Sequence, residues 1–94
     1  MKLTVIGTGN MGRALIGGFV SGGVFKPEDI VCYDVRSESA DEVSARFGCM
    51  SAATAKEAVK DSDFVLMAVK PVHFDGALRD IVSSLKPGVI VLSI

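Results

Sequence analysis

Residues 2–12 read KLTVIGTGNMG, and this stretch decides the fold. Residues 2–6 are a short run rich in β-branched side chains, which predicts a strand. The run breaks at Gly7, and apolar side chains then recur at helical spacing from Met11 to Phe19. The stretch therefore predicts a strand, a tight turn and a helix in direct succession.

Further strand patterns follow along the chain, separated by helical patterns. The expected strands cover residues 2–6, 30–33, 49–51, 64–69 and 89–92, and the expected helices cover residues 11–22, 39–48, 54–60 and 71–85. Strands that alternate with helices of this length predict a parallel sheet with right-handed crossovers. The predicted fold class is α/β, a doubly wound sheet of the Rossmann type with the element order βαβαβαβαβ.

Local signals indicate where the elements begin and which of them are buried. Residues 39–42 (SADE) and 54–57 (TAKE) have the form of capping boxes at helix starts. Residues 64–69 are apolar without alternation, which is typical of a parallel strand covered on both faces. The strand at residues 89–92 is likewise expected to be buried. The apolar residues expected to share one face of the last helix are Phe74, Leu78, Ile81, Val82 and Leu85.

Composition excludes several classes of function. Ten Lys and Arg against eleven Asp and Glu leave a formal net charge of −1, so no broad basic surface is available for nucleic acid or an anionic membrane. No apolar run reaches the roughly 20 residues that span a bilayer, and residues 1–6 enter a strand pattern without a secretory leader. Cys32 and Cys49 form neither a disulfide framework nor a zinc pattern, and we expect buried, reduced thiols. Residues 1–94 are therefore expected to form one cytoplasmic domain without a metal site.

The turn at residues 7–12, GTGNMG, has the form G-x-G-x-x-G. The first glycine permits a tight turn, the second lets the backbone approach a pyrophosphate, and the third lets helix and strand pack closely. The following helix points free N–H groups and the positive end of its dipole at the phosphates. Asp34 supplies the acidic residue expected at the end of the second strand. Together these features predict a dinucleotide site.

The choice between NAD and NADP stays open at the level of sequence. Asp34 is positioned to accept hydrogen bonds from the adenosine ribose, which favours NAD because a carboxylate repels a 2′-phosphate. Arg36 and Ser37 could instead grip a 2′-phosphate, with Asp34 turned aside or paired with Arg36. The plainer alternative is that Arg36 and Ser37 are solvated loop and helix-cap residues.

Three segments together resemble one enzyme family: IGTGNMG at residues 6–12, GGF at residues 17–19 and AVKP at residues 68–71. The chain resembles, from residue 1 to residue 94, the amino-terminal domain of the pyrroline-5-carboxylate reductase family, and the AVKP segment is the most telling part. The resemblance implies an oxidoreductase that reduces 1-pyrroline-5-carboxylate to proline with NADPH or NADH, by hydride transfer to a C=N bond in proline biosynthesis.

The resemblance also implies which residues bind the cofactor. The glycine turn would hold the pyrophosphate, residues 34–37 the adenosine ribose and any 2′-phosphate, and residues 68–71 the nicotinamide end. Ala55 is a departure, because family members often carry there an Asn that helps to hold the adenosine portion. No catalytic residue is assigned within the chain. The expected cofactor-binding residues are Ile6, Gly7, Thr8, Gly9, Asn10, Met11, Gly12, Asp34, Val35, Arg36, Ser37, Ala68, Val69, Lys70 and Pro71.

Members of that family continue into a helical carboxy-terminal domain that forms the dimer and supplies the substrate pocket. Ile94 follows directly on an apolar strand pattern, so we expect the sequence to be truncated before such a domain. The resemblance then implies a homo-oligomer assembled through the missing domain. It also implies that residues 1–94 alone bind cofactor without turning over.

Two other hypotheses fit the same glycine turn. A non-catalytic module could sense a dinucleotide and pass the signal to an attached domain, since fold alone does not define function. Another NADP-linked reductase, of the deazaflavin-linked or hydroxyacid type, would share the turn and differ in substrate.

Lys70 and His73 lie near the expected cofactor edge, but solvated side chains are the simpler interpretation of both.

Overall fold

Five parallel strands form one sheet in the computed structural model, which describes residues 1–94. The strands are β1 (Leu3–Ile6), β2 (Ile30–Tyr33), β3 (Met50–Ser51), β4 (Phe64–Met67) and β5 (Ile90–Ser93). Their order is β3-β2-β1-β4-β5, so β1 lies at the centre between β2 and β4. In this order the chain builds one half of the sheet outward from β1 and then returns to build the other half.

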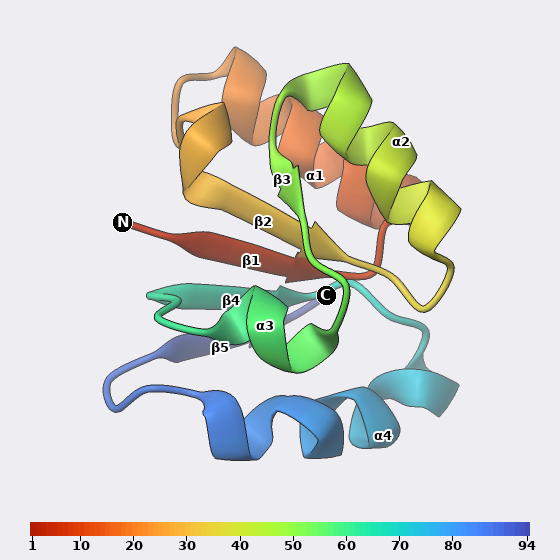
Figure 1. Ribbon diagram of the computed structural model, residues 1–94, viewed down its shortest axis with the longest axis vertical. Helices are drawn as coiled ribbons and strands as arrows, with labels where there is room; N and C mark the ends of the chain where they lie inside the picture. The colour runs from red at the N-terminus through yellow and green to blue at the C-terminus, as the bar shows by residue number, and fades with distance from the viewer.

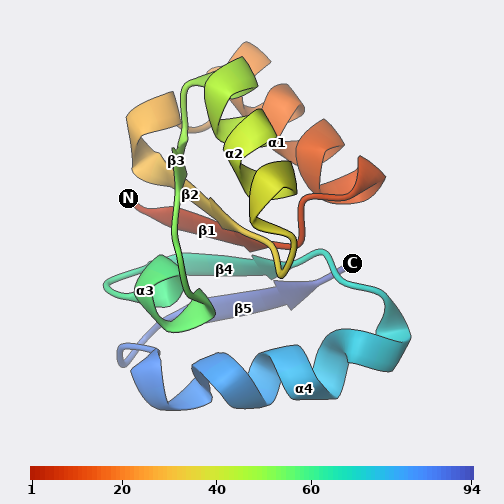
Figure 2. The same cartoon turned by 45° about the vertical axis from the view of Figure 1, so that its right-hand side comes forward.

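Helices cover both faces of the sheet, as Figure 1 shows. The helices are α1 (Asn10–Ser21), α2 (Ser37–Phe47), α3 (Ala55–Val59) and α4 (Pro71–Ile81), with short 3-10 turns at η1 (Pro27–Asp29) and η2 (Val82–Ser84). Helices α1 and α2 lie on one face, and α3 and α4 lie on the other, an arrangement that Figure 2 shows from a second direction. The predicted fold class, a doubly wound parallel α/β sheet of the Rossmann type, is confirmed.

Alternation along β1 divides the core into two clusters. Leu3 and Val5 pack into the cluster beneath α1 and α2, whereas Ile6 joins the cluster beneath α3 and α4. Thr4 also points to the second face, where its buried hydroxyl lies 2.5 Å from the Ala58 carbonyl oxygen and 2.5 Å from the Ser62 hydroxyl. No buried side-chain polar atom lacks a hydrogen-bond partner, so the polar residue in the central strand leaves no unmet desolvation penalty.

One of the two predicted capping boxes is wrong and the other is supported. Helix α2 begins at Ser37, two residues before the predicted start, and Arg36 caps it without a side-chain hydrogen bond. The Ser39 hydroxyl is not a cap because it lies against the glycine turn, 2.8 Å from the Thr8 hydroxyl. At α3 the Thr54 hydroxyl accepts a hydrogen bond from the Glu57 backbone N–H at 3.1 Å, as the pattern predicts.

Two predictions of burial near the end of the chain are also wrong. Ile90 and Leu92 of β5 are 50% and 49% exposed, because β5 is an edge strand and α1 and α2 lie over the opposite half of the sheet. Only the alternate residues of this segment, Val89 and Val91, pack beneath α4. Val82 is exposed because the helix gives way after Ile81 to a 3-10 turn, whose tighter winding moves Val82 off the apolar stripe.

The thiols of Cys32 and Cys49 are both free and buried in the cluster beneath α1 and α2, as predicted. None of the helices combines the length and the apolar character that a membrane crossing requires.

A matched pair of substitutions tests the packing of α2 against the sheet. Val43 on α2 is 1% exposed and Val72 on α4 is 81% exposed, so the same change removes buried contacts at only one of them. We expect Val43→Ala to lower the free energy of unfolding by about 2 kcal/mol through lost burial and a residual cavity. Val72→Ala should change it by less than about 0.5 kcal/mol. Urea unfolding of the two variants measures the difference, and equal effects would contradict this packing.

Candidate functional site

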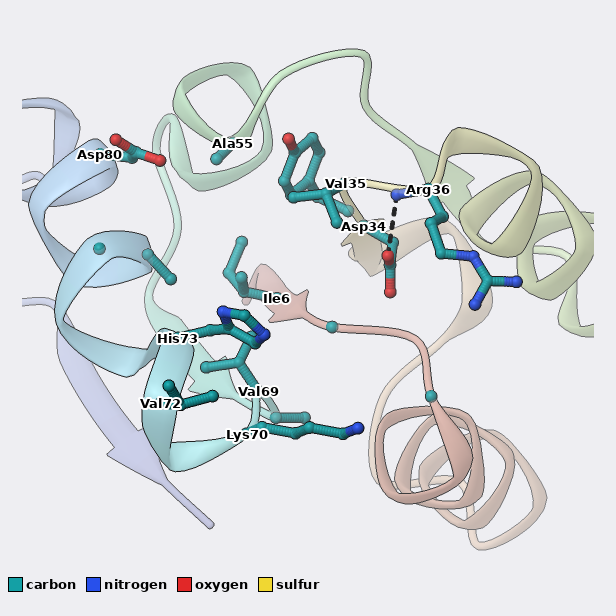
Figure 3. Close-up of a pocket in the computed structure, with 16 residues that line it drawn as sticks. Ile6, Asp34, Val35, Arg36, Ala55, Val69, Lys70, Val72, His73 and Asp80 are labelled. Atoms are coloured by element: carbon teal, nitrogen blue, oxygen red, sulfur yellow. Dashed lines mark hydrogen bonds between the residues drawn. The ribbon is translucent and has the colours of Figure 1, made fainter.

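A cleft of about 650 Å³ opens where β1, β2 and β4 end. Parallel strands direct their carboxyl ends to one edge, and ligands of open α/β sheets bind there, at the point where the strand order reverses. The lining residues are Ile6, Gly7, Gly9, Tyr33, Asp34, Val35, Arg36, Ala55, Ala68, Val69, Lys70, Val72, His73, Gly76, Ala77 and Asp80. Figure 3 shows them converging from the strand ends and from α3 and α4.

The three glycines of the turn meet three different constraints. Gly7 has a φ of +102°, and a Cβ there would lie 2.4 Å from the Ala68 carbonyl oxygen. A Cβ on Gly12 would lie 2.0 Å from the Gly7 carbonyl oxygen. Gly9 has a φ of −69° and no atom within 4 Å of an added Cβ. The fold itself therefore requires glycine at Gly7 and Gly12, whereas at Gly9 the absence of a side chain leaves open space at the cleft.

The N-terminus of α1 is open to an anion. Gly9 is its N-cap, no side chain caps it, and its first turn contains no acidic residue. The first N–H groups of a helix have no partner within the helix, and they carry the positive end of its dipole. This end of α1 can therefore bind phosphate through backbone N–H groups.

Asp34 is held by the turn and by its own loop. Its Oδ2 accepts hydrogen bonds from the Thr8 N–H at 2.7 Å and the Thr8 hydroxyl at 2.9 Å, and its Oδ1 accepts from the Arg36 N–H at 3.0 Å. Partial burial alone would raise the pKa of Asp34, but these hydrogen bonds outweigh it and hold the pKa below its ordinary value. The carboxylate is therefore ionised at neutral pH and directed at backbone and hydroxyl donors.

Arg36 projects from the loop after β2 and is exposed. Asp34 bonds the Arg36 backbone, and the guanidinium takes part in neither of the two ion pairs of the structure, Arg13 with Glu42 and Lys86 with Asp63. A charged group at the rim of a cleft that forms no ion pair within the protein is able to bind an anionic ligand.

The cleft brings together nine of the fifteen expected cofactor-binding residues. These are Ile6, Gly7, Gly9, Asp34, Val35, Arg36, Ala68, Val69 and Lys70. The other six do not line it and are Thr8, Asn10, Met11, Gly12, Ser37 and Pro71. Thr8 and Gly12 are buried within the turn, whereas Met11, which the apolar pattern placed on the inner face of its helix, is exposed. Each of the three predicted segments thus contributes residues to the cleft, and their cofactor-binding roles stay predictions.

The wall formed by α4 was not predicted, except that His73 was expected near the cofactor edge. Val72, His73, Gly76, Ala77 and Asp80 line the cleft at i, i+1, i+4, i+5 and i+8, the spacing of one helical face. The small pair at residues 76–77 was the available signal, since it leaves room between α4 and β2. In Figure 3 the His73 ring lies over the middle of the cleft, and Asp80 lies at its far end near Ala55.

The parallel sheet, the glycine turn and the cleft at its point of reversal define a Rossmann-type α/β domain of the kind that binds dinucleotides. Comparison with known proteins agrees with that class. Residues 2–94 match the family described as NADP oxidoreductase, coenzyme F420-dependent, and the chain belongs to this family.

The individual relatives and solved structures described next are all reductases. The chain is 34% identical over 93 residues to pyrroline-5-carboxylate reductase of Escherichia coli K12, covering 99% of this chain and 35% of that protein. A solved pyrroline-5-carboxylate reductase from Coxiella burnetii superimposes with a TM-score of 0.86 at 26% identity, covering 99% of this chain and 34% of that one. An imine reductase from Myxococcus stipitatus in complex with NADP⁺ gives a TM-score of 0.79 at 30% identity, covering 100% of this chain and 32% of that one.

The chain thus spans about a third of the length of the relatives that it matches. The resemblance to the amino-terminal domain of pyrroline-5-carboxylate reductases, predicted from the three sequence segments, is confirmed.

Substitution of two glycines separates the needs of the fold from those of a ligand. We expect Gly12→Ala to lower the free energy of unfolding by roughly 3 kcal/mol, because its Cβ meets backbone that cannot move aside. Gly9→Ala should cost less than about 1 kcal/mol, the difference between glycine and alanine at an N-cap. Urea unfolding of both variants tests the distinction. Equal destabilisation would mean that Gly9 also serves the fold.

Proposed function

We propose that this chain is the NADPH- or NADH-binding domain of an enzyme that reduces 1-pyrroline-5-carboxylate to proline, and so serves proline biosynthesis. The observation that carries the proposal is the cleft at the switch point of the sheet, with an uncapped helix N-terminus and open space at Gly9. The relation to the pyrroline-5-carboxylate reductase of Escherichia coli supports the choice of substrate.

The residues of the cleft fit the parts of a dinucleotide. The N-terminus of α1 provides N–H groups for the pyrophosphate, and Gly9 allows a close approach of the backbone. The loop after β2 carries Arg36 for the adenosine end. Residues 68–70, after β4, provide a mostly apolar wall for the nicotinamide end. When bound, the cofactor supplies the hydride for reduction of a C=N bond, whereas these residues bind and orient it.

Ala55 lines the cleft at the start of α3, on the same side as the end of β2. This position supports the inference that the residue faces the adenosine portion. A methyl group there can pack against a base or ribose but cannot donate a hydrogen bond. In this chain, binding of the adenosine end of the cofactor therefore depends more heavily on the loop after β2.

We place substrate binding and self-association in sequence beyond these 94 residues, since the relatives are about three times as long. Homo-oligomerisation through a helical domain remains a prediction. We also propose a cytoplasmic location, which the two free thiols support because reduced cysteines are typical of that compartment.

A second candidate function follows from the family description, which names coenzyme F420. In that case the same domain would serve a hydride exchange between NADP and a deazaflavin. The nucleotide cleft is common to both candidates, so the substrate distinguishes them. Hydride exchange between reduced F420 and NADP⁺ by the longer protein, without reduction of 1-pyrroline-5-carboxylate, would favour the second candidate.

Calorimetric titration with NADPH and NADH tests the role of Arg36. We expect NADPH to bind more tightly, and Arg36→Ala to weaken NADPH binding about tenfold through loss of a charge-assisted contact to the 2′-phosphate. NADH binding should change less than about twofold. Arg79→Ala is the matched control, because Arg79 is an exposed arginine of α4 outside the cleft. A preference for NADH that Arg36→Ala leaves unchanged would contradict this role.

An activity assay tests whether this domain can catalyse the reaction without the rest of the enzyme. We expect residues 1–94 to bind NADPH and to produce no proline from 1-pyrroline-5-carboxylate, because the substrate pocket is proposed to lie elsewhere. Loss of the NADPH absorbance measures the reaction, with the reductase of Escherichia coli as the positive control. Measurable proline formation by the 94-residue chain would show that it contains a substrate pocket of its own.

A further inference from the structure

Thr8, between the first two glycines of the turn, is completely buried although it is polar. Its hydroxyl lies 2.9 Å from Asp34 Oδ2 and 2.8 Å from the Ser39 hydroxyl. An ionised carboxylate can only accept, so the single hydroxyl proton of Thr8 is donated to Asp34. Ser39 must then donate, either to the Thr8 hydroxyl or to the Thr8 carbonyl oxygen at 3.3 Å. When Ser39 donates to the Thr8 hydroxyl, the hydrogen bonds run in one direction from Ser39 through Thr8 to Asp34.

Arg13, in the first turn of α1, connects these hydrogen bonds to the two helices α1 and α2. Its Nε donates to the Thr8 carbonyl oxygen at 3.1 Å, and a terminal nitrogen donates to the Ser39 hydroxyl at 3.3 Å. Its other terminal nitrogen lies 3.6 Å from a carboxylate oxygen of Glu42 on α2. The turn, the end of β2, α1 and α2 are therefore all joined at Thr8.

These bonds limit what Asp34 can offer a ligand. Each carboxylate oxygen has two lone pairs, and both on Oδ2 are used by Thr8 while one on Oδ1 is used by the Arg36 N–H. A ribose that is held by a carboxylate through both hydroxyls needs one free lone pair on each oxygen. Asp34 could meet that need only by giving up its bond to the Thr8 N–H or its bond to the Thr8 hydroxyl, and the donor concerned would then lose its acceptor inside the protein.

We propose that Asp34 is a positioning residue that acts with Thr8, Ser39 and Arg13 to hold the glycine turn in its phosphate-binding shape, and that it does not discriminate NADH from NADPH. This proposal rests on the proposed function, because the turn is taken to bind a dinucleotide. Asp34 thereby contributes equally to both cofactors through the pyrophosphate they share. Discrimination is left to Arg36, whose guanidinium is free of internal ion pairs.

The first experiment uses the free protein and needs no cofactor. Amide proton shifts of Thr8 and Arg36 are followed by NMR as the pH is lowered through the titration of Asp34. Both amides should report one shared midpoint, below the ordinary aspartate value of about 3.9. Arg36 on the same loop, Arg13 on α1 and Glu42 on α2 are the charged groups grouped around this network. Amides that do not follow Asp34 would overturn the proposal.

Variants of Thr8 and Ser39 distinguish the network from a general effect on folding. Thr8→Val keeps the shape and removes the hydroxyl, so the midpoint reported by Arg36 should rise toward the ordinary value. Thr8→Ser keeps the hydroxyl and should restore the low midpoint. Ser39→Ala, which leaves both Thr8 bonds to Asp34, should produce a smaller rise than Thr8→Val. An unchanged midpoint in Thr8→Val would overturn the proposal.

The second experiment measures both cofactors by calorimetry. Asp34→Asn should weaken NADPH and NADH by the same factor, about tenfold, and leave the ratio of their dissociation constants within about twofold. Asp75→Asn is the matched control, since Asp75 is an exposed aspartate of α4 outside the cleft and should change neither constant. Loss of NADH affinity alone, with NADPH affinity kept or raised, would identify Asp34 as a ribose ligand and overturn the proposal.

A wild-type chain that binds neither cofactor would contradict the proposed function, and with it the claim that the network serves a phosphate-binding turn. The titration of the free protein would still show whether Asp34 holds the turn. The two failures are therefore distinguishable.

Discussion

The close approach of α1 to the end of β1 is the constraint on which the rest of the structure depends. A Cβ on Gly12 would collide with the Gly7 carbonyl oxygen, and a Cβ on Gly7 would collide with the backbone of Ala68 after β4, so neither residue can carry a side chain. The Gly7 N–H bonds the Tyr33 carbonyl oxygen at 2.8 Å, and the Ala68 N–H bonds the Ile6 carbonyl oxygen at 2.8 Å. The ends of β1, β2 and β4 are thereby fixed at one point. The cleft is the space left above that point.

The two faces of the sheet give the cleft different walls. Helix α1 meets it end on, so its contribution is backbone N–H groups and a dipole. Helix α4 meets it side on, with the small residues Gly76 and Ala77 toward the opening. The turn that we propose to bind phosphate therefore lies opposite a helix face that contributes apolar and small residues together with His73 and Asp80. This asymmetry is a consequence of the order in which the chain crosses the sheet.

Most of the fold could be predicted because short-range patterns of apolar residues indicate the strands and helices. The three glycines indicate the turn. The errors arise where a distant partner decides the outcome. Ser39 has the sequence of a helix cap, but its hydroxyl bonds Thr8 from another element. Leu92 has the sequence of a buried strand, but the strand lies at the edge of the sheet. The α4 wall of the cleft likewise depends on how that helix packs, and the small pair at residues 76–77 is a weak local signal for it.

Asp34 shows how one residue type at one position can serve two purposes. A buried hydroxyl without a partner costs about 1–3 kcal/mol, so a threonine between the first two glycines needs an acceptor inside the protein. Asp34 is that acceptor, at 2.9 Å from the hydroxyl. With alanine in place of Thr8, this demand would disappear and the carboxylate would regain a lone pair for a ribose hydroxyl. The role of the acidic residue that follows β2 therefore depends on the Thr8 side chain, which it contacts directly, as much as on the acid itself.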